Sequence, residues 1–393
     1  MFRNGHHPPS PLGNLRKQWA AYAILCLSFL AGGYALLSQE WTPDIAARWL
    51  ILPSVMMAYL LAVLWRNLDA NHRPGESWLL PTIGWGNALT LLRGALVAAL
   101  AGFLFIPKPE GWLAWAPGIL YTLSDAADFF DGYVARVTRH ATRLGEILDM
   151  SFDGLGVLVA STLAVQYGQV PVWYLGVALA RPLFLAGLWL RNRLGKPNQD
   201  LPPSLSRRVF AGLQMGFLAI VLWPLFSPPG THIAAALFGL PLLSGFVLDW
   251  LIVSGIFQPG PKTSLDREAF LIRWLPVSLR LGILVLGLGL FSRASQDLPG
   301  QAMNMPLLGV LHAVAISLIV FGLTARLSAI LALCILGFYQ MFASLTPVQI
   351  ALAVAYTAIL YLGSGEFSLW APEDQLVYRR AGEPRSVDVE QAI

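Results

Sequence analysis

Four aspartates lie close together in an otherwise apolar part of the chain, in the stretch DFFDGYVARVTRHATRLGEILDMSFD. Asp128 and Asp131 are three residues apart, and Asp149 and Asp153 are four apart. On a helix, side chains at these spacings share one face. A charged carboxylate inside a membrane helix costs about 2.5–3.5 kcal/mol unless it is paired or bound, so four of them indicate a functional site.

Small and polar residues complete the two faces. Gly132, Ala135 and Arg136 continue the first stripe, and Gly145 begins the second. The residues between Arg136 and Gly145 are polar enough to form a hairpin in water, which would turn the two carboxylate stripes toward each other. Hard oxygen ligands of this kind suit Mg²⁺ or Mn²⁺ better than zinc. The sequence therefore predicts a divalent cation site between two helices.

The pattern D-x2-D-G-x2-A-R-x8-G-x3-D-x3-D resembles the signature of the CDP-alcohol phosphotransferases, with every fixed position filled. The resemblance implies a membrane enzyme of phospholipid biosynthesis, of the phosphatidyltransferase type. Such an enzyme transfers a substituted phosphate group from a CDP-linked donor to an alcohol acceptor and releases CMP. The resemblance favours CDP-diacylglycerol over a soluble CDP-alcohol as donor, and it implies Mg²⁺ or Mn²⁺ in a two-metal site.

The resemblance also implies roles for single residues. Asp128, Asp131 and Asp149 would be metal ligands, and Asp153 would bind metal and act as the general base. Binding of the CDP-linked donor would fall to Asn87, Ala88, Leu89, Thr90, Gly132, Ala135, Arg136, Thr142 and Gly145. For Asn87 and Thr90, capping of a helix start is an alternative interpretation.

Two arginines are candidates for binding the acceptor. Arg181 lies in an apolar run, where a cation needs a partner, and a backbone carbonyl could be that partner. Arg208 resembles a lysine of family members that use phosphorylated acceptors, but Phe210 and Ala211 depart from that segment. Arg208 could equally be a simple loop charge. The acceptor stays open between glycerol phosphate, inositol phosphate, serine, inositol and the head group of another lipid.

Composition places the chain among polytopic membrane proteins. Of its 393 residues, 56% are hydrophobic and only 12% are charged. The net charge of +4 is spread over loops, so no nucleic-acid partner is expected. Two cysteines in apolar runs indicate neither a disulfide framework nor a cysteine metal site.

Apolar runs long enough to cross a bilayer predict an all-α polytopic fold with about twelve spans. The expected spans are 18–38, 48–65, 88–106, 113–135, 145–166, 172–190, 209–226, 232–255, 270–291, 303–323, 326–344 and 347–363. Residues 76–257 would hold a six-helix core, preceded by two extra helices in 1–75. A polar linker at 258–268 would lead to four more helices in 269–393, which resemble the DoxX-like membrane family and end in a polar tail.

Basic residues are concentrated in alternate loops, which places both termini and the aspartate hairpin in the cytoplasm. The expected location is therefore the cytoplasmic membrane, with the active site facing the cytoplasm and a homodimer as the expected assembly, on family grounds. Two other functions stay open: a carboxylate-lined ion or metal transporter, and a scaffold with an inactive transferase core. His312, in an apolar helix, is interpreted as a packed or water-bonded histidine.

Overall fold

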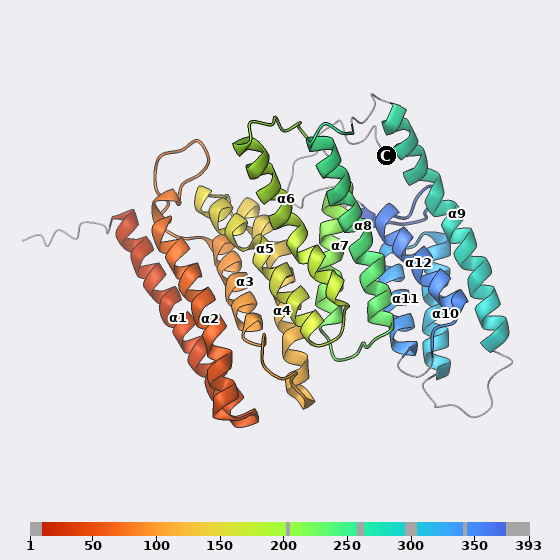
Figure 1. Cartoon of the computed structure of the whole chain (residues 1–393), viewed down its shortest axis with the longest axis horizontal. Helices are drawn as coiled ribbons and strands as arrows, with labels where there is room; N and C mark the ends of the chain where they lie inside the picture. The colour runs from red at the N-terminus through yellow and green to blue at the C-terminus, as the bar shows by residue number, and fades with distance from the viewer. Residues whose placement is uncertain (1–9, 202–204, 258–262, 295–304, 341–343, 375–393) are drawn as a thin grey trace, which may run out of the picture. The chain divides into compact units, whose positions relative to one another are not determined.

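The protein is all-helical in the residues that the structure, a computed structural model, describes: 10–201, 205–257, 263–294, 305–340 and 344–374. Side chains are described throughout these ranges except at Asp153 and at 205–206, 263–272, 291–294 and 305–306. The α-helices are α1 Pro11–Glu40, α2 Pro43–Arg66, α3 Trp85–Ala101, α4 Ala116–Val137, α5 Arg143–Gln166, α6 Leu175–Arg193, α7 Leu205–Val221, α8 Gly230–Val253, α9 Thr263–Ala294, α10 Met305–Phe321, α11 Ala325–Tyr339 and α12 Pro347–Leu362 (Figure 1). Each predicted span corresponds to one of these helices.

Within the described residues, six helical segments are both long and apolar enough to cross a membrane: Pro11–Glu40, Pro43–Arg66, Arg143–Gln166, Val172–Arg193, Gly230–Val253 and Arg273–Leu290. Helices α3, α10, α11 and α12 are apolar but shorter. The span expected at 113–135 is α4, whose aspartates and Arg136 make it too polar to join the six. The chain is thus consistent with a multi-pass membrane protein.

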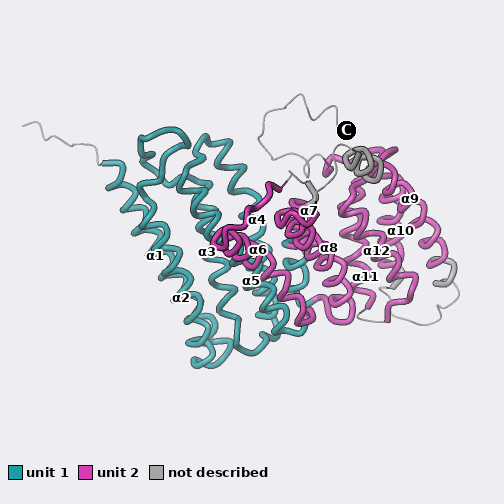
Figure 2. The backbone as a smooth tube through the Cα atoms, turned by 45° about the horizontal axis from the view of Figure 1, so that its top comes forward, with its two compact units in different colours: residues 1–168, 215–224, 384–393 teal, residues 169–214, 225–383 magenta. Residues whose placement is uncertain are grey.

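Contacts divide the chain into two compact units, shown in teal and magenta in Figure 2. In the first unit, α1 packs on α2, and α3 packs against α2, α4 and α5. An apolar cluster fills the space between α1, α2, α3 and α5, with Leu15, Leu64, Leu144 and Leu148 fully buried. The end of α7, from Met215, also belongs to this unit. Helix α3 is therefore the central helix, with neighbours on several sides.

The second unit holds α6, the start of α7, and α8 to α12. Helices α6 and α8 meet through Phe184, Phe246 and Trp250, and Gly187 leaves room for the Trp250 ring. Helices α10 and α12 meet at His312, whose Nε2 lies 3.0 Å from the Tyr356 hydroxyl oxygen. The interpretation of His312 as a packed histidine is confirmed, since it is 1% exposed and bonded to this tyrosine.

A buried arginine organises one end of the α9–α12 group. The Arg280 guanidinium donates to the carbonyl oxygens of Val320 at 2.6 and 2.9 Å, Ser364 at 3.2 Å and Glu366 at 3.0 Å. These bonds hold the segment after α12 against the turn between α10 and α11, where Thr324 N donates to Trp370 O. The segment that follows α12 thus packs on the turn that joins α10 to α11.

The predicted linker at 258–268 is helical from Thr263 onward, because α9 begins there. Residues 258–262 of that linker lie outside the described part. The predicted domain boundaries near residues 75 and 257 stay predictions.

Candidate metal centre

Three of the four aspartates converge. Asp128 and Asp131 from α4 and Asp149 from α5 each offer a carboxylate oxygen, and these atoms lie within 4.8 Å of one another. The connection between the two helices is only five residues long, so α5 returns alongside α4. The prediction that two carboxylate stripes face each other is confirmed for these three residues. Asp153 lies one turn further along α5, and its side chain is outside the described part.

Arg93 of α3 supplies the counter-charge to this group of three carboxylates. Its guanidinium forms an ion pair with Asp128, and its Nη2 lies 3.0 Å from Asp149 Oδ1. Arg93 is 5% exposed, whereas the side chains of Asp128 and Asp149 are 29% and 50% exposed. Three carboxylates against one guanidinium leave the group negative, so a divalent cation would be bound favourably.

Asp131 is held from α3 as well. The Thr90 hydroxyl donates to Asp131 Oδ2 over 2.9 Å, one turn before Arg93 on the same helix. Asp131 is 9% exposed and Thr90 is 4% exposed. A bond in which the acceptor is charged is shorter and stronger than a neutral one, so it fixes this carboxylate before any ligand arrives.

Asn87 and Thr142 join α3 to the start of α5. Asn87 Nδ2 donates to the Thr142 hydroxyl at 3.0 Å, and that hydroxyl accepts from Gly145 N at 3.1 Å. Thr142 is therefore the N-cap of α5. The interpretation of Asn87 and Thr90 as caps is wrong: both lie inside α3, whose N-cap Gly84 makes no side-chain bond.

Two glycines allow the helices to approach at this level. A Cβ on Gly86 would lie 2.7 Å from Ala135 Cβ, and one on Gly145 would lie 2.5 Å from Asn87 Oδ1. Ala135 is thus a contact of α4 with α3, and Gly145 a contact of α5 with α3. Any larger residue at these places would push apart the helices that carry the aspartates.

The segment before α3 holds the hairpin between α4 and α5. His140 Nε2 donates to Thr82 O over 2.9 Å, and Arg143 N donates to His72 O over 2.9 Å. Gly84 has a φ of +83°, and a Cβ there would overlap the His140 ring. The hairpin that positions the aspartates is therefore anchored by residues outside the aspartate motif.

The other predicted donor-binding residues lie nearby on the same helices. Ala88 and Leu89 are in α3, partly buried, beside Asn87. Gly132 and Arg136 are one turn apart on α4, and a Cβ on Gly132 would lie 3.2 Å from Arg136 Nη1. The small residue at 132 thus leaves space for the arginine side chain. Their roles toward a donor stay predictions.

The two predicted acceptor residues belong to the second unit. Arg181 is exposed on α6, and Arg208 is exposed on α7. The neighbouring Arg207 forms an ion pair, with its Nε 2.8 Å from Asp249 Oδ2 of α8. The roles of Arg181 and Arg208 toward an acceptor stay predictions.

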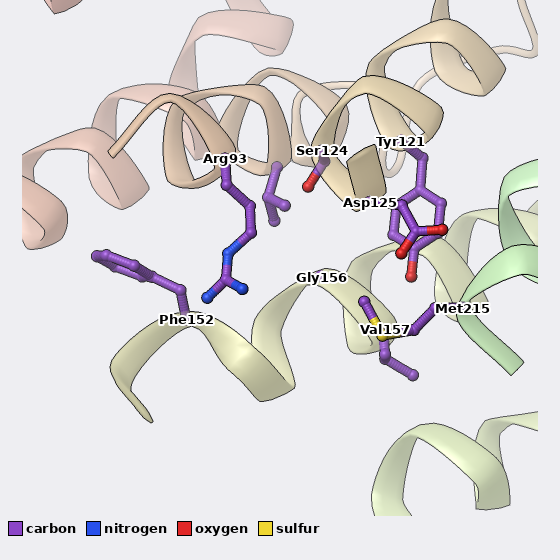
Figure 3. A pocket seen from close by; sticks show the side chains of 9 residues that line it. Arg93, Tyr121, Ser124, Asp125, Phe152, Gly156, Val157 and Met215 are labelled. Atoms are coloured by element: carbon purple, nitrogen blue, oxygen red, sulfur yellow. The ribbon is translucent and has the colours of Figure 1, made fainter. Parts of the chain in front are cut away.

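Sequence reasoning missed the role of Arg93. Asn87, Thr90 and Arg93 are spaced by three, so they share a face of α3, and an arginine in an apolar run was a signal of an acidic partner. Beside Arg93 lies a cavity that Tyr121, Ser124 and Asp125 of α4 also line (Figure 3). Asp125 is one turn before Asp128 and outside the motif.

Comparison with known proteins agrees with this geometry. Residues 84–253 match the family model described as CDP-alcohol phosphatidyltransferase. Residues 84–253 belong to the CDP-alcohol phosphatidyltransferase family of enzymes. All three converging aspartates, Arg93, Thr90 and Asn87 lie within the matched residues.

Three relatives show how far the likeness extends. A CDP-diacylglycerol–glycerol-3-phosphate 3-phosphatidyltransferase of Cereibacter sphaeroides is 31% identical over 116 residues, 28% of this chain and 49% of the relative. A protein of the same name from Yersinia enterocolitica is 28% identical over 171 residues, 41% of this chain and 87% of the relative. A Mycobacterium bovis protein named "Putative cardiolipin synthase" is 28% identical over 141 residues, 35% of this chain and 63% of the relative.

The chain thus spans about half the length of the first of these relatives and less than two thirds of the third. No solved structure matches. The DoxX-like resemblance of residues 269–393 gains no support from these comparisons and stays a prediction.

Proposed function

We propose that the chain transfers the phosphatidyl group of CDP-diacylglycerol to the hydroxyl of an alcohol and releases CMP, with Mg²⁺ or Mn²⁺ as cofactor. The observation that carries the proposal is the group of three carboxylates from α4 and α5, whose ligand oxygens lie within 4.8 Å at the motif positions. The relatives named for phosphatidyl transfer from CDP-diacylglycerol support the choice of donor.

The residues present fit a divalent cation. Asp128, Asp131 and Asp149 would hold it, with Asp153 as a further ligand, and four carboxylates could serve two ions. When bound, such ions stabilise charge on the entering and leaving oxygens of a phosphoryl group. Thr90 would keep Asp131 in place, and Arg93 would keep Asp128 and Asp149 from repelling each other before metal and donor bind.

The transfer itself needs a base and a phosphate-binding cation. The acceptor oxygen would form a bond to the phosphorus that carries the diacylglycerol, while the bond from that phosphorus to the CMP oxygen breaks. The acceptor proton would pass to the carboxylate of Asp153, and CMP would leave with the electron pair. Arg136, at the end of α4, would donate to the donor phosphates.

The other predicted residues complete the proposal. Asn87, Ala88, Leu89, Thr90, Gly132, Ala135, Thr142 and Gly145 would form the donor site around the ends of α3, α4 and α5. Arg181 and Arg208 would act toward the acceptor. The site would face the cytoplasm of a multi-pass protein in the cytoplasmic membrane, in a homodimer, with residues 269–393 as an appended DoxX-like module.

The test is an acceptor screen on the full chain in detergent, with CDP-diacylglycerol and either MgCl₂ or MnCl₂. We expect CMP release with at least one alcohol acceptor, and loss of that release in EDTA. A chain that releases no CMP with any acceptor, but carries divalent ions across vesicle membranes, would establish the transporter alternative instead. A folded chain with neither activity would favour the scaffold alternative.

A further inference from the structure

The cavity beside the aspartate group contains features that the proposed transfer does not yet use. It lies between α3, α4, α5 and the end of α7, all within the first unit. Arg93, Tyr121, Ser124 and Asp125 supply its polar lining (Figure 3). Because Arg93 also contacts Asp128 and Asp149, the cavity adjoins the carboxylates.

The side chain of Tyr121 lines this cavity. The residue is 2% exposed, and its hydroxyl oxygen is buried with no hydrogen-bond partner among the described residues. Figure 3 shows the ring reaching from α4 toward Gly156 of α5, with the hydroxyl at the tip. A buried hydroxyl left unbonded is costly, so this group is suited to bind a polar ligand.

Asp125, four residues after Tyr121 on α4, lines the same cavity and is partly buried. It is one turn before Asp128 on α4, so it faces the cavity on the side away from the hairpin. Ser124, which is 4% exposed, adds a second hydroxyl. The remaining lining is apolar and includes Phe152 and Met215.

We propose that this cavity receives the acceptor, and that the acceptor is a neutral polyol with a second hydroxyl besides the one that attacks. The Asp125 carboxylate accepts a hydrogen bond from this second hydroxyl, and the Tyr121 hydroxyl donates to its oxygen. This inference rests on the proposed function. The polyol can be free or can form the head group of an uncharged lipid, because both present the same kind of hydroxyls.

The charges around the cavity select against a phosphorylated acceptor. Such an acceptor would place its negative charge in a cavity lined by the Asp125 carboxylate, and like charges close together repel. Arg93 lines the same cavity but is already paired with Asp128 and Asp149. A neutral polyol avoids the repulsion and satisfies the Tyr121 hydroxyl.

The test measures acceptor kinetics for the full chain in detergent with CDP-diacylglycerol and MnCl₂. The probes are glycerol, galactosyl diacylglycerol (an uncharged lipid with a polyol head group), glycerol 3-phosphate and serine. The variants are Asp125→Asn and Tyr121→Phe, with Tyr34→Phe on the exposed face of α1 as the matched control. We expect wild type to prefer glycerol or galactosyl diacylglycerol. The Asp125→Asn and Tyr121→Phe variants should each raise the acceptor KM about tenfold, as loss of one hydrogen bond predicts.

Readouts that do not concern the acceptor separate this role from a structural one. The KM for CDP-diacylglycerol, the MnCl₂ dependence and the melting temperature should match those of wild type in both variants. Asp125→Asn should also improve the use of glycerol 3-phosphate relative to glycerol. Saturation-transfer NMR of glycerol with the full chain, which needs no turnover, should show binding that Tyr121→Phe weakens.

Two results would overturn the inference while leaving the proposed function standing: an active wild type that prefers glycerol 3-phosphate or serine, or variants with an unchanged acceptor KM. A wild type that releases no CMP with any probe would contradict the proposed function instead. In that case the NMR titration decides on the cavity, because absence of glycerol binding overturns the polyol site and binding lost in Tyr121→Phe supports it.

Discussion

Replacing Arg93 by glutamine should make the folding of the protein depend on divalent cations. The change removes the guanidinium that pairs with Asp128 and Asp149 and leaves their carboxylates facing each other without a counter-charge. A divalent cation can supply the missing positive charge. The loss of stability should therefore be largest in EDTA and smallest in MnCl₂.

The size of the effect follows from the exposure of the partners. Removing one member of a fully buried ion pair costs about 3–5 kcal/mol. Arg93 is buried, but the side chains of Asp128 and Asp149 are 29% and 50% exposed, so water can solvate them once the arginine is gone. We therefore expect a smaller loss, about 1–3 kcal/mol.

The assay is thermal unfolding in detergent, with EDTA and with saturating MnCl₂. Arg66→Gln, on an exposed arginine at the end of α2, is the matched control and should behave as wild type. Arg93→Gln should melt well below wild type in EDTA and gain more from MnCl₂ than wild type does. If Arg93→Gln melts with wild type in both conditions, the ion pairs do not stabilise the aspartate group and the reasoning is refuted.

Three further predictions follow. Asp153→Asn should lower CMP release by about 100-fold or more, because it removes the general base, and should change the KM for CDP-diacylglycerol only slightly. Turnover at the wild-type rate from roughly pH 6 to 9 would exclude the base role. Gly86→Ala should destabilise the protein by about 1–3 kcal/mol in thermal unfolding, because its Cβ would lie 2.7 Å from Ala135 Cβ, whereas Gly32→Ala, with open space around it, should not. Arg280→Met should cost about 2–5 kcal/mol by leaving several carbonyl groups unbonded, and Arg273→Met, at the more exposed pair with Glu366, should cost about 0–1 kcal/mol in the same measurement.

The sequence was sufficient for the helices and for the group of aspartates. An apolar run in lipid must be helical, because only a helix satisfies its backbone hydrogen bonds within the same segment. Each predicted span accordingly corresponds to a helix. The convergence of Asp128, Asp131 and Asp149 followed from helical spacing and a short polar connection. Both predictions needed only residues close together in the chain.

Contacts between distant residues could not be predicted in this way. Asparagine is a common helix-capping residue, but Asn87 instead donates a hydrogen bond to the Thr142 hydroxyl, 55 residues away in the sequence. In the sequence, Arg93 resembles the basic residues that flank membrane spans on the cytoplasmic side. Its role as the partner of Asp128 and Asp149 is visible only when α3, α4 and α5 are packed together. Likewise, the partners of Arg280 are backbone carbonyls, which carry no signal in the sequence.

The central claim, that Asp128, Asp131 and Asp149 hold the divalent cation of a transferase, is tested most directly by counting bound Mn²⁺ by electron paramagnetic resonance. The same samples of the full chain are then assayed for CMP release from CDP-diacylglycerol. Wild type and Asp69→Asn, an exposed aspartate outside the site, should bind Mn²⁺ and turn over, whereas Asp149→Ala should lose both. Asp149→Ala that binds Mn²⁺ and releases CMP as wild type does would contradict the account.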